Sequence, residues 1–189
     1  MTSRSDSNGS SAGGSDAGAA QSSGDPLLRP PTADDGYAVH QLIAACPPLD
    51  PNSVYCNLLQ CSHFADTSVA VELDGGLAGF ISGYIPPRQP DTLFIWQVAV
   101  SGRARGLGLG KRMLRHLLER PACSQVCYLD TTVTADNAAS WGMFRSLARD
   151  LGADCRDAPH FERERHFGGD HDDEYLLRIG PFPVQAASS

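Results

Sequence analysis

The sequence has no long hydrophobic run, although 41% of its 189 residues are hydrophobic. No apolar segment approaches the roughly 18 residues that a membrane-spanning helix needs, so we expect no membrane-embedded part. The chain also lacks an excess of basic residues: its formal net charge is -7 and its pI is about 5.2. Because most of such a surface repels a polyanion, we expect no general binding to nucleic acid or to an anionic membrane.

Residues 1–25 lack large apolar side chains after Met1 and consist mostly of Ser, Gly, Ala, Asp and Asn. This composition does not offset the entropy cost of ordering, so we predict a disordered N-terminal tail. The segment also lacks the apolar stretch of about 7–15 residues of a secretory signal, and we expect a cytoplasmic protein. The remaining length suits one domain, at residues 26–182, followed by a flexible tail at residues 183–189.

The six cysteines do not form a metal-binding pattern. Cys123 and Cys127 have three residues between them, but no second Cys/His pair lies at the spacing of a zinc site. Without a secretory signal we expect reducing surroundings and free thiols. The sequence therefore predicts no metal.

Hydrophobic periodicity predicts a mixed α/β domain whose central sheet is covered by helices. Asp74-Gly75-Gly76 is typical of a hairpin turn between two strands. The polar segment 160–174 is expected to be a loop. The expected strands are 27–30, 68–73, 77–85, 92–100, 126–133 and 175–179. Apolar residues at helical spacing mark helices at 37–43, 54–59, 113–118 and 141–148. The first helix is expected to end near Cys46, the third to begin within the glycine run and the last to stop at Gly152.

Residues 101–118 indicate an anion site, because they contain five of the fifteen basic residues and no acid. Gly106, Gly108 and Gly110 allow backbone N–H groups to turn inward at a helix start, where the helix dipole adds partial positive charge. The order G-x-G-x-G fits neither a dinucleotide fingerprint nor a P-loop, in which a hydroxyl residue follows the lysine. A tight turn without a ligand is the alternative.

The frame Arg105-x-x-Gly108-x-Gly110, which follows the apolar Val98-Ala99-Val100, resembles the acetyl-CoA pyrophosphate loop of the GCN5-related N-acetyltransferases. The resemblance implies their fold, a mixed and mainly antiparallel central sheet flanked by helices. It also implies acetyl-CoA as co-substrate. The cofactor-binding residues that it implies are Val98, Ala99, Val100, Arg105, Gly106, Leu107, Gly108, Leu109, Gly110, Lys111, Asn137, Trp141 and Phe144.

Of two positions after the glycine loop, one extends this resemblance and the other departs from it. Asn137 is similar to the family residue that hydrogen-bonds the pantetheine arm, although a helix cap is the alternative. Seven residues later the family's usual tyrosine, the proton donor to the departing thiolate, is replaced by Phe144. A thiol with a pKa near 8.5 can leave as the thiolate without that donor.

Five longer segments resemble one family within this superfamily, the L-2,4-diaminobutyrate N4-acetyltransferases of ectoine synthesis. They occur in chain order between about Arg29 and Pro181: CPPLDPNSVY, GFISGY, PDTLFIWQVAV, LDTTVTADNAASW and GGDHDDEYLLRI. The resemblance implies direct transfer of acetyl from acetyl-CoA to the N4 amine of L-2,4-diaminobutyrate, in a ternary complex, by a homodimer. The alternatives are another small cationic amine as substrate, or a catalytically inactive acyl-CoA-binding module.

The substrate of such an enzyme carries two ammonium groups and a carboxylate, and its amine must lose a proton before attack. Its pocket should therefore combine acids, hydrogen-bond donors and an aromatic wall. The backbone N–H groups at the end of strand 92–100 are expected to polarise the thioester carbonyl. The implied substrate-binding residues are Asp50, Tyr55, Trp96, Asp130, Thr132, His171 and Glu174, of which Asp130, Tyr55 and His171 are the catalytic candidates.

Each of these candidates also has a structural alternative. Asp50, among prolines, can organise a turn, and Tyr55 or Trp96 can pack in a core. Asp130 lies in an apolar strand, where a carboxylate requires either a partner or a substrate. His171 lies in an acid-rich loop and is a solvated residue as readily as a base.

Overall fold

The computed structural model describes residues 24–184. The strands are β1 (Leu27–Arg29), β2 (Val69–Leu73), β3 (Gly76–Tyr84), β4 (Thr92–Val100), β5 (Tyr128–Thr134), β6 (Cys155–Phe161) and β7 (Glu174–Ile179). The helices are α1 (Gly36–Ala44), α2 (Val54–Ser62), α3 (Leu109–Leu118), α4 (Ala138–Leu151) and α5 (Arg163–Phe167). Short 3-10 turns are η1 (Ala33–Asp35), η2 (Ala65–Thr67), η3 (Gly102–Ala104) and η4 (Pro121–Cys123).

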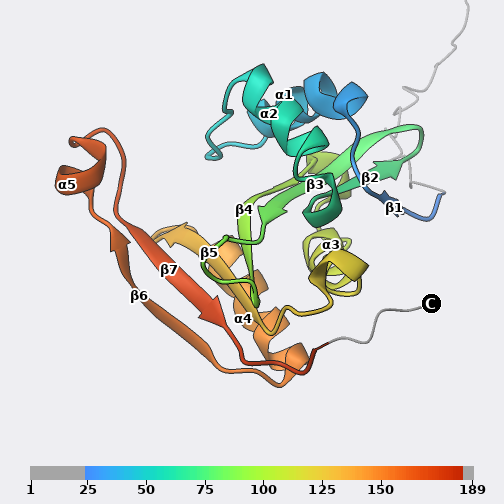
Figure 1. Cartoon of the computed structure of the whole chain (residues 1–189). Coiled ribbons are helices and arrows are strands. Elements are labelled where there is room, and N and C mark those ends of the chain that lie inside the picture. The colour runs from blue at the N-terminus through green and yellow to red at the C-terminus, as the bar shows by residue number, and fades with distance from the viewer. Residues whose placement is uncertain (1–23, 185–189) are drawn as a thin grey trace, which may run out of the picture.

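The strands form one seven-stranded sheet in the order β1-β2-β3-β4-β5-β7-β6 (Figure 1). Neighbouring strands are antiparallel except β4 and β5, which are parallel. The predicted mixed, mainly antiparallel sheet flanked by helices is confirmed. The predicted tails at 1–25 and 183–189 lie outside the described residues, apart from 24–25 and 183–184.

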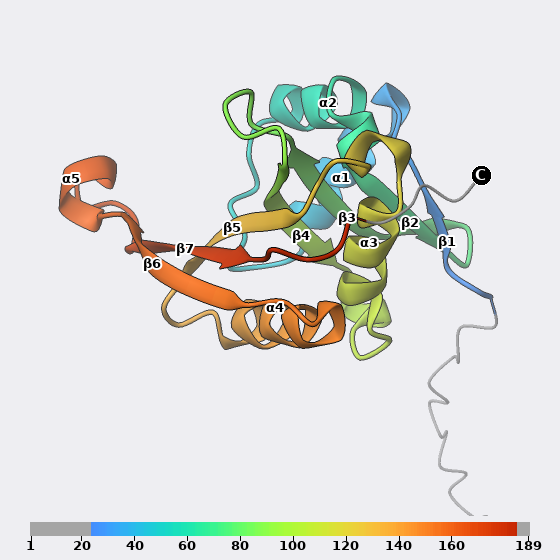
Figure 2. The ribbon, with the colours of Figure 1, turned by 60° about the horizontal axis from the view of Figure 1, so that its bottom comes forward.

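Helices cover both faces of the central strands (Figure 2). α1 and α2 lie over one face, where Val39, Ile43 and Phe80 are fully buried. α3 and α4 lie over the other face, where Met113 and Leu147 belong to the larger core. No helix in the described part of the chain is long and apolar enough to span a membrane.

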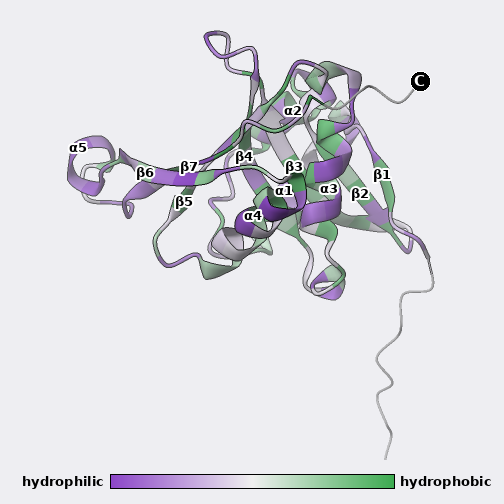
Figure 3. Cartoon of the chain, turned by 90° about the horizontal axis from the view of Figure 1, so that it is seen from below, coloured by the Kyte–Doolittle hydropathy of each residue, from purple (hydrophilic) through white to green (hydrophobic). Residues whose placement is uncertain are grey.

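Neither β6 nor α5 was predicted: no element was expected at residues 153–159, and segment 160–174 was expected to be a loop. Six of the seven residues of β6 are exposed, so the strand carries no hydrophobic period. It forms by main-chain pairing with β7, from Cys155↔Ile179 to Phe161↔Glu174. β6, α5 and β7 together form an arm that projects from the body (Figure 2) and is mostly hydrophilic (Figure 3).

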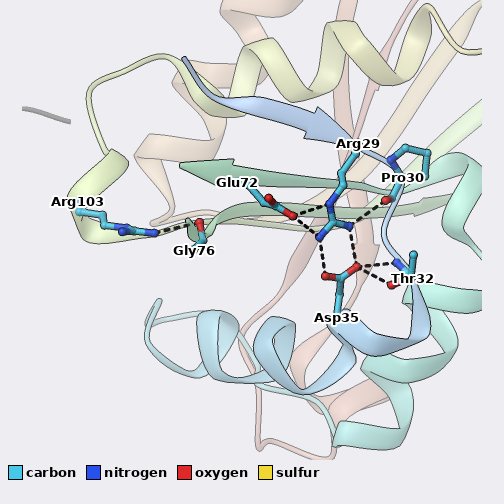
Figure 4. A network of polar contacts seen from close by, with 7 residues as sticks. All are labelled: Arg29, Pro30, Thr32, Asp35, Glu72, Gly76 and Arg103. Atoms are coloured by element: carbon cyan, nitrogen blue, oxygen red, sulfur yellow. Dashed lines mark hydrogen bonds and ion pairs between the residues drawn. The ribbon is translucent and has the colours of Figure 1, made fainter. Parts of the chain in front are cut away.

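Arg29 joins β1 to β2 and to the start of α1 (Figure 4). Its guanidinium donates to Asp35 at 2.7 and 2.8 Å and to Glu72 at 2.7 Å. Asp35 also accepts from the backbone N–H of Thr32 at 2.7 Å. These hydrogen bonds, above all those from Arg29, lower the pKa of Asp35 from 3.8 to about 2. The Asp35 carboxylate is therefore stabilised as an anion in the folded state.

Acid is expected to weaken this junction. Because the folded pKa of Asp35 lies below its unfolded value, its contribution to stability is complete above about pH 4 and is lost as the pH falls toward 2. Asp35→Asn should therefore lower the free energy of unfolding at pH 7 by about 1–2 kcal/mol, since partial exposure of Arg29 reduces the full linkage value.

Urea unfolding at pH 7 and pH 2.5 measures this effect, with the exposed neighbour Asp34→Asn as control. The deficit of Asp35→Asn relative to wild type should shrink at pH 2.5. An equal deficit at both pH values would contradict the assigned role of the carboxylate.

Candidate active site

The pairing of β4 with β5 stops partway along both strands. The last register pair is Ile95↔Thr131, whereas β4 continues to Val100 and β5 to Thr134. Beyond that pair the described residues place no strand against this edge of β4, and a cavity of about 670 Å³ begins there. Main-chain groups of β4 therefore face the cavity. Residues 95–98 and 131–134 line this part of the cavity.

Trp96 is the extra residue of a β-bulge in β4. Ser82 pairs with Gln97 and Gly83 pairs with Ile95, so no residue of β3 lies opposite Trp96. A bulge of this kind redirects a side chain out of the regular alternation. Trp96 is 45% exposed and lines the cavity, so the structure places it in the candidate site and outside both hydrophobic cores.

The outer part of the cavity lies between the arm and the α1–α2 loop, residues 45–53. Asp50 lines it from the loop, and His171 and Glu174 line it from the arm. The lining is acidic, which stabilises a cationic ligand. Its carboxylates are Asp50, Asp136, Asp170, Asp172 and Glu174, and its one guanidinium, Arg163, pairs with Asp172 at 2.9 Å.

Glu174 has a carboxylate oxygen, Oε2, that is buried and has no hydrogen-bond partner in the described part of the chain. Its Oε1 lies 3.9 Å from Nε2 of His171, whose ring packs on Phe167 with centroids 4.7 Å apart. A buried carboxylate oxygen without a donor is costly. An ammonium group bound here would remove that cost.

The glycine loop lies at the N-terminus of α3. Gly106 and Gly108 have φ values of 81° and 69°, in the left-handed region that glycine adopts readily. Gly108 is the N-cap, and no side chain caps the helix, so the N–H groups of the first turn are available to an anion. A Cβ at either glycine would meet nothing within 4 Å, so the space over the loop is open.

The basic side chains around this loop divide into two groups. Arg103 donates to two carbonyl groups of the β2–β3 turn, one of them that of Gly76 (Figure 4). Lys111 and Arg115 both pair with Asp150 of α4, at 2.8 and 3.1 Å, and lower the pKa of its carboxyl group. Arg105 and Arg112 are exposed at the loop, and their side chains have no hydrogen bond or ion pair within the described part of the chain.

The other predicted cofactor-binding residues lie in different places. Val98 lines the cavity, as does the predicted substrate residue Thr132. Leu107 is exposed on the glycine loop. Four further predicted residues are packed in the protein: Ala99 and Val100 at the end of β4, and Leu109 and Gly110 at the start of α3.

Of the three predicted residues at the N-cap of α4 or within it, two reach the cavity. Asn137 lines it and also caps α4, since its side chain accepts from the N–H of Ser140 at 3.1 Å. Phe144 is 2% exposed and forms part of the cavity wall. Trp141 instead faces a second cavity, where its ring contacts Tyr175 edge-on.

Asp130 and Tyr55 are not among the residues that line the cavity. Asp130 is 3% exposed, and its two carboxylate oxygens accept from Arg178 of β7 at 2.7 and 2.8 Å. The partner that an apolar strand requires for this carboxylate is therefore a protein side chain. Tyr55 is 70% exposed on α2. Of the three catalytic candidates, the structure brings only His171 to the cavity.

Sequence reasoning missed several residues that line the cavity. Those on the arm lie in the segment expected to be a loop. Gln97 had a usable signal, because a polar residue inside an apolar strand requires a partner. The missed residues are Pro48, Leu49, Asn52, Ile95, Gln97, Thr131, Val133, Thr134, Asp136, Ser140, Phe161, Arg163, Phe167, Asp170 and Asp172.

No group of three or more potential metal ligands occurs among residues 24–184. All six cysteines are free thiols.

Two comparisons of sequence identify the family. The model described as the acetyltransferase (GNAT) family matches residues 37–148. The L-2,4-diaminobutyric acid acetyltransferase of Bordetella parapertussis is 54% identical over 156 residues, covering 82% of this chain and 84% of that protein. The enzyme of the same name from Methylotuvimicrobium alcaliphilum is 51% identical over 160 residues, covering 85% of this chain and 93% of that protein.

Solved structures agree with this assignment. Diaminobutyrate acetyltransferase EctA from Paenibacillus lautus, in complex with L-2,4-diaminobutyric acid and coenzyme A, has a TM-score of 0.81 and 38% identity, covering 86% of this chain and 99% of that chain. The ribosomal-protein-S18-alanine N-acetyltransferase of Escherichia coli shares the fold, with a TM-score of 0.64 at 18% identity, covering 87% of this chain and 97% of that chain. The chain belongs to the acetyltransferase (GNAT) family and, within it, to the family of L-2,4-diaminobutyric acid acetyltransferases.

Proposed function

We propose that this protein transfers the acetyl group of acetyl-CoA to the N4 amine of L-2,4-diaminobutyrate, giving the N4-acetyl product used in ectoine synthesis. The observation that carries the proposal is the acidic cavity that opens where β4 and β5 diverge. The family relationship supports it, because relatives at 51% and 54% identity carry the name of this activity.

The glycine loop fits acetyl-CoA, which supplies an acetyl group activated as a thioester. The N–H groups at the start of α3, together with Arg105 and Arg112, would hold the pyrophosphate. Gly106 and Gly108 leave the space over the loop free of side chains. Asn137 and the cavity-facing edge of β4 would hold the pantetheine arm by hydrogen bonds.

The cavity offers a base for the amine. At pH 7 an amine with a pKa near 10 is neutral only about one time in a thousand, so proton removal is required. Asp130 is engaged by Arg178, and we propose that His171 accepts the proton, with Glu174 beside it. Backbone N–H groups of β4 beyond Ile95 would polarise the carbonyl, and with Phe144 in place of tyrosine the thiolate leaves without a protein donor.

We further propose a cytoplasmic homodimer in which residues 26–182 form one catalytic domain. The free thiols suit a reducing compartment. A two-stranded ribbon is marginally stable by itself, and contact with a second copy would stabilise the arm. Sedimentation of the full chain tests the dimer.

Steady-state kinetics with a series of amines test the proposed function. kcat/KM for diaminobutyrate should exceed the values for ornithine, lysine and putrescine by at least about tenfold, because one extra methylene is worth about 1–3 kcal/mol in a fitted pocket. In the same assay, His171→Gln should lower kcat by at least about tenfold if the imidazole accepts the proton. Equal use of all the amines would contradict the substrate assignment, and the absence of CoA release would indicate an acyl-CoA-binding module.

A further inference from the structure

The α1–α2 loop carries Asp50 to the cavity without regular secondary structure. Asn52 has a φ of 56°, in the left-handed region that a side chain disfavours. Its backbone N–H donates to Oδ1 of Asp50 at 3.2 Å. The position of the Asp50 carboxylate therefore depends on what holds the loop in this conformation.

One side-chain amide of the sheet holds the loop at two points. Nε2 of Gln97 donates to the main-chain oxygen of Asp50 at 2.6 Å, and Oε1 of Gln97 accepts from Nδ2 of Asn52 at 3.1 Å. Gln97 is only 7% exposed. Because the buried amide uses its donor and its acceptor on the same loop, breaking the contact would leave buried polar groups unpaired.

The place of Gln97 in β4 joins this contact to the rest of the site. Gln97 follows the bulged Trp96 directly and pairs across the sheet with Ser82. One short stretch of β4 therefore places both the Trp96 indole and the α1–α2 loop at the cavity. Pairing of β4 with β3 continues through Gln97 to Val100, and this rigid edge suits a residue that must fix a neighbouring loop.

We propose that Gln97 is a positioning residue that fixes the Asp50 carboxylate against the bound ammonium group of the amine. The inference rests on the proposed function, which supplies that ammonium group. Gln97 acts through Asp50, because its amide is occupied by the loop. Its loss therefore weakens amine binding and leaves the glycine loop unchanged.

Gln97→Leu tests this proposal, since it removes both hydrogen bonds and keeps an apolar side chain that is one atom shorter. The KM for diaminobutyrate should rise at least about tenfold, the loss of about 1.4 kcal/mol of binding, whereas the KM for acetyl-CoA should change less than about twofold. Asp50→Asn should raise the same KM. The double variant should match Asp50→Asn alone, because no carboxylate is left to position.

The matched control is Gln60→Leu, which removes a fully buried amide of α2 that does not line the cavity. It should leave the KM for both substrates unchanged, and thermal unfolding shows whether each variant folds. If Gln97→Leu fails to fold, Asn52→Gly removes the same Oε1 contact from the loop side and should raise the amine KM by a smaller factor. In the Asp50→Asn background, Asn52→Gly should not raise the amine KM further.

Additive KM effects in the double variant, or an equal rise of both KM values in Gln97→Leu, would overturn the proposal. A wild-type preference for another amine would instead refute the proposed function. The same cycle of variants, measured with that amine, would still decide the role of Gln97.

Discussion

The Gly108→Val variant is expected to bind CoA at least about tenfold more weakly than the wild type. Gly108 has a φ of 69°, and a β-branched residue in this region costs about 1–2 kcal/mol. Rotation to a negative φ relieves that cost but turns the first N–H groups of α3 away from the anion. The fold should persist, because the added Cβ meets no protein atom within 4 Å.

Calorimetric titration with CoA measures this loss, with Gly102→Val as the matched control. Gly102 lies on the preceding η3 turn, has no left-handed φ and has open space at its Cβ position. The affinity of the Gly102→Val variant for CoA should therefore change less than about twofold. Trp96→Ala provides the reciprocal comparison, because it should raise the KM for the amine more than that for acetyl-CoA. Equal weakening by both glycine variants would show that the loop conformation is not what binds the anion.

The Arg178→Ala variant is expected to lower the free energy of unfolding by about 2–4 kcal/mol. Asp130 and Arg178 lie directly opposite each other on β5 and β7, and the Asp130 side chain is only 5% exposed. Removing the guanidinium leaves a buried carboxylate without its two donors. The upper end of the usual penalty is not reached, because the Arg178 side chain is 39% exposed and water can enter.

Urea unfolding measures this effect, because urea does not screen charge. Arg156→Ala is the matched control, since Arg156 lies opposite Arg178 on β6 but its pair with Asp154 is exposed on both sides. Arg156→Ala should lower the free energy of unfolding by less than about 0.5 kcal/mol. A similar loss in both variants would show that burial of Asp130 does not govern the stability of this region.

The glycine loop could be predicted from the sequence because its signal is local. The positive φ values of Gly106 and Gly108 and the start of α3 all lie within a few consecutive residues. The same holds for the hairpin at Asp74 and for the end of α4 at Gly152, where residues with positive φ mark the turn. Backbone requirements of this kind can be predicted from the local sequence without knowledge of the fold.

The partners of the polar residues could not be predicted, because they are brought together by the sheet. Asp130 and Arg178 are 48 residues apart in sequence, and Gln97 and Asp50 are 47 apart. The arm escaped prediction for a related reason. β6 follows from its register with β7 and not from a pattern of its own.

The parallel contact between β4 and β5 divides the sheet into two groups of strands, each contiguous in the chain. β1 to β4 end at Val100, and β5 to β7 begin at Tyr128. The strand contact between the two groups ends at Ile95↔Thr131, so we expect two cooperative folding units that dock across it. The cavity lies at their boundary, and a ligand bound there would increase the amide-exchange protection of both units together.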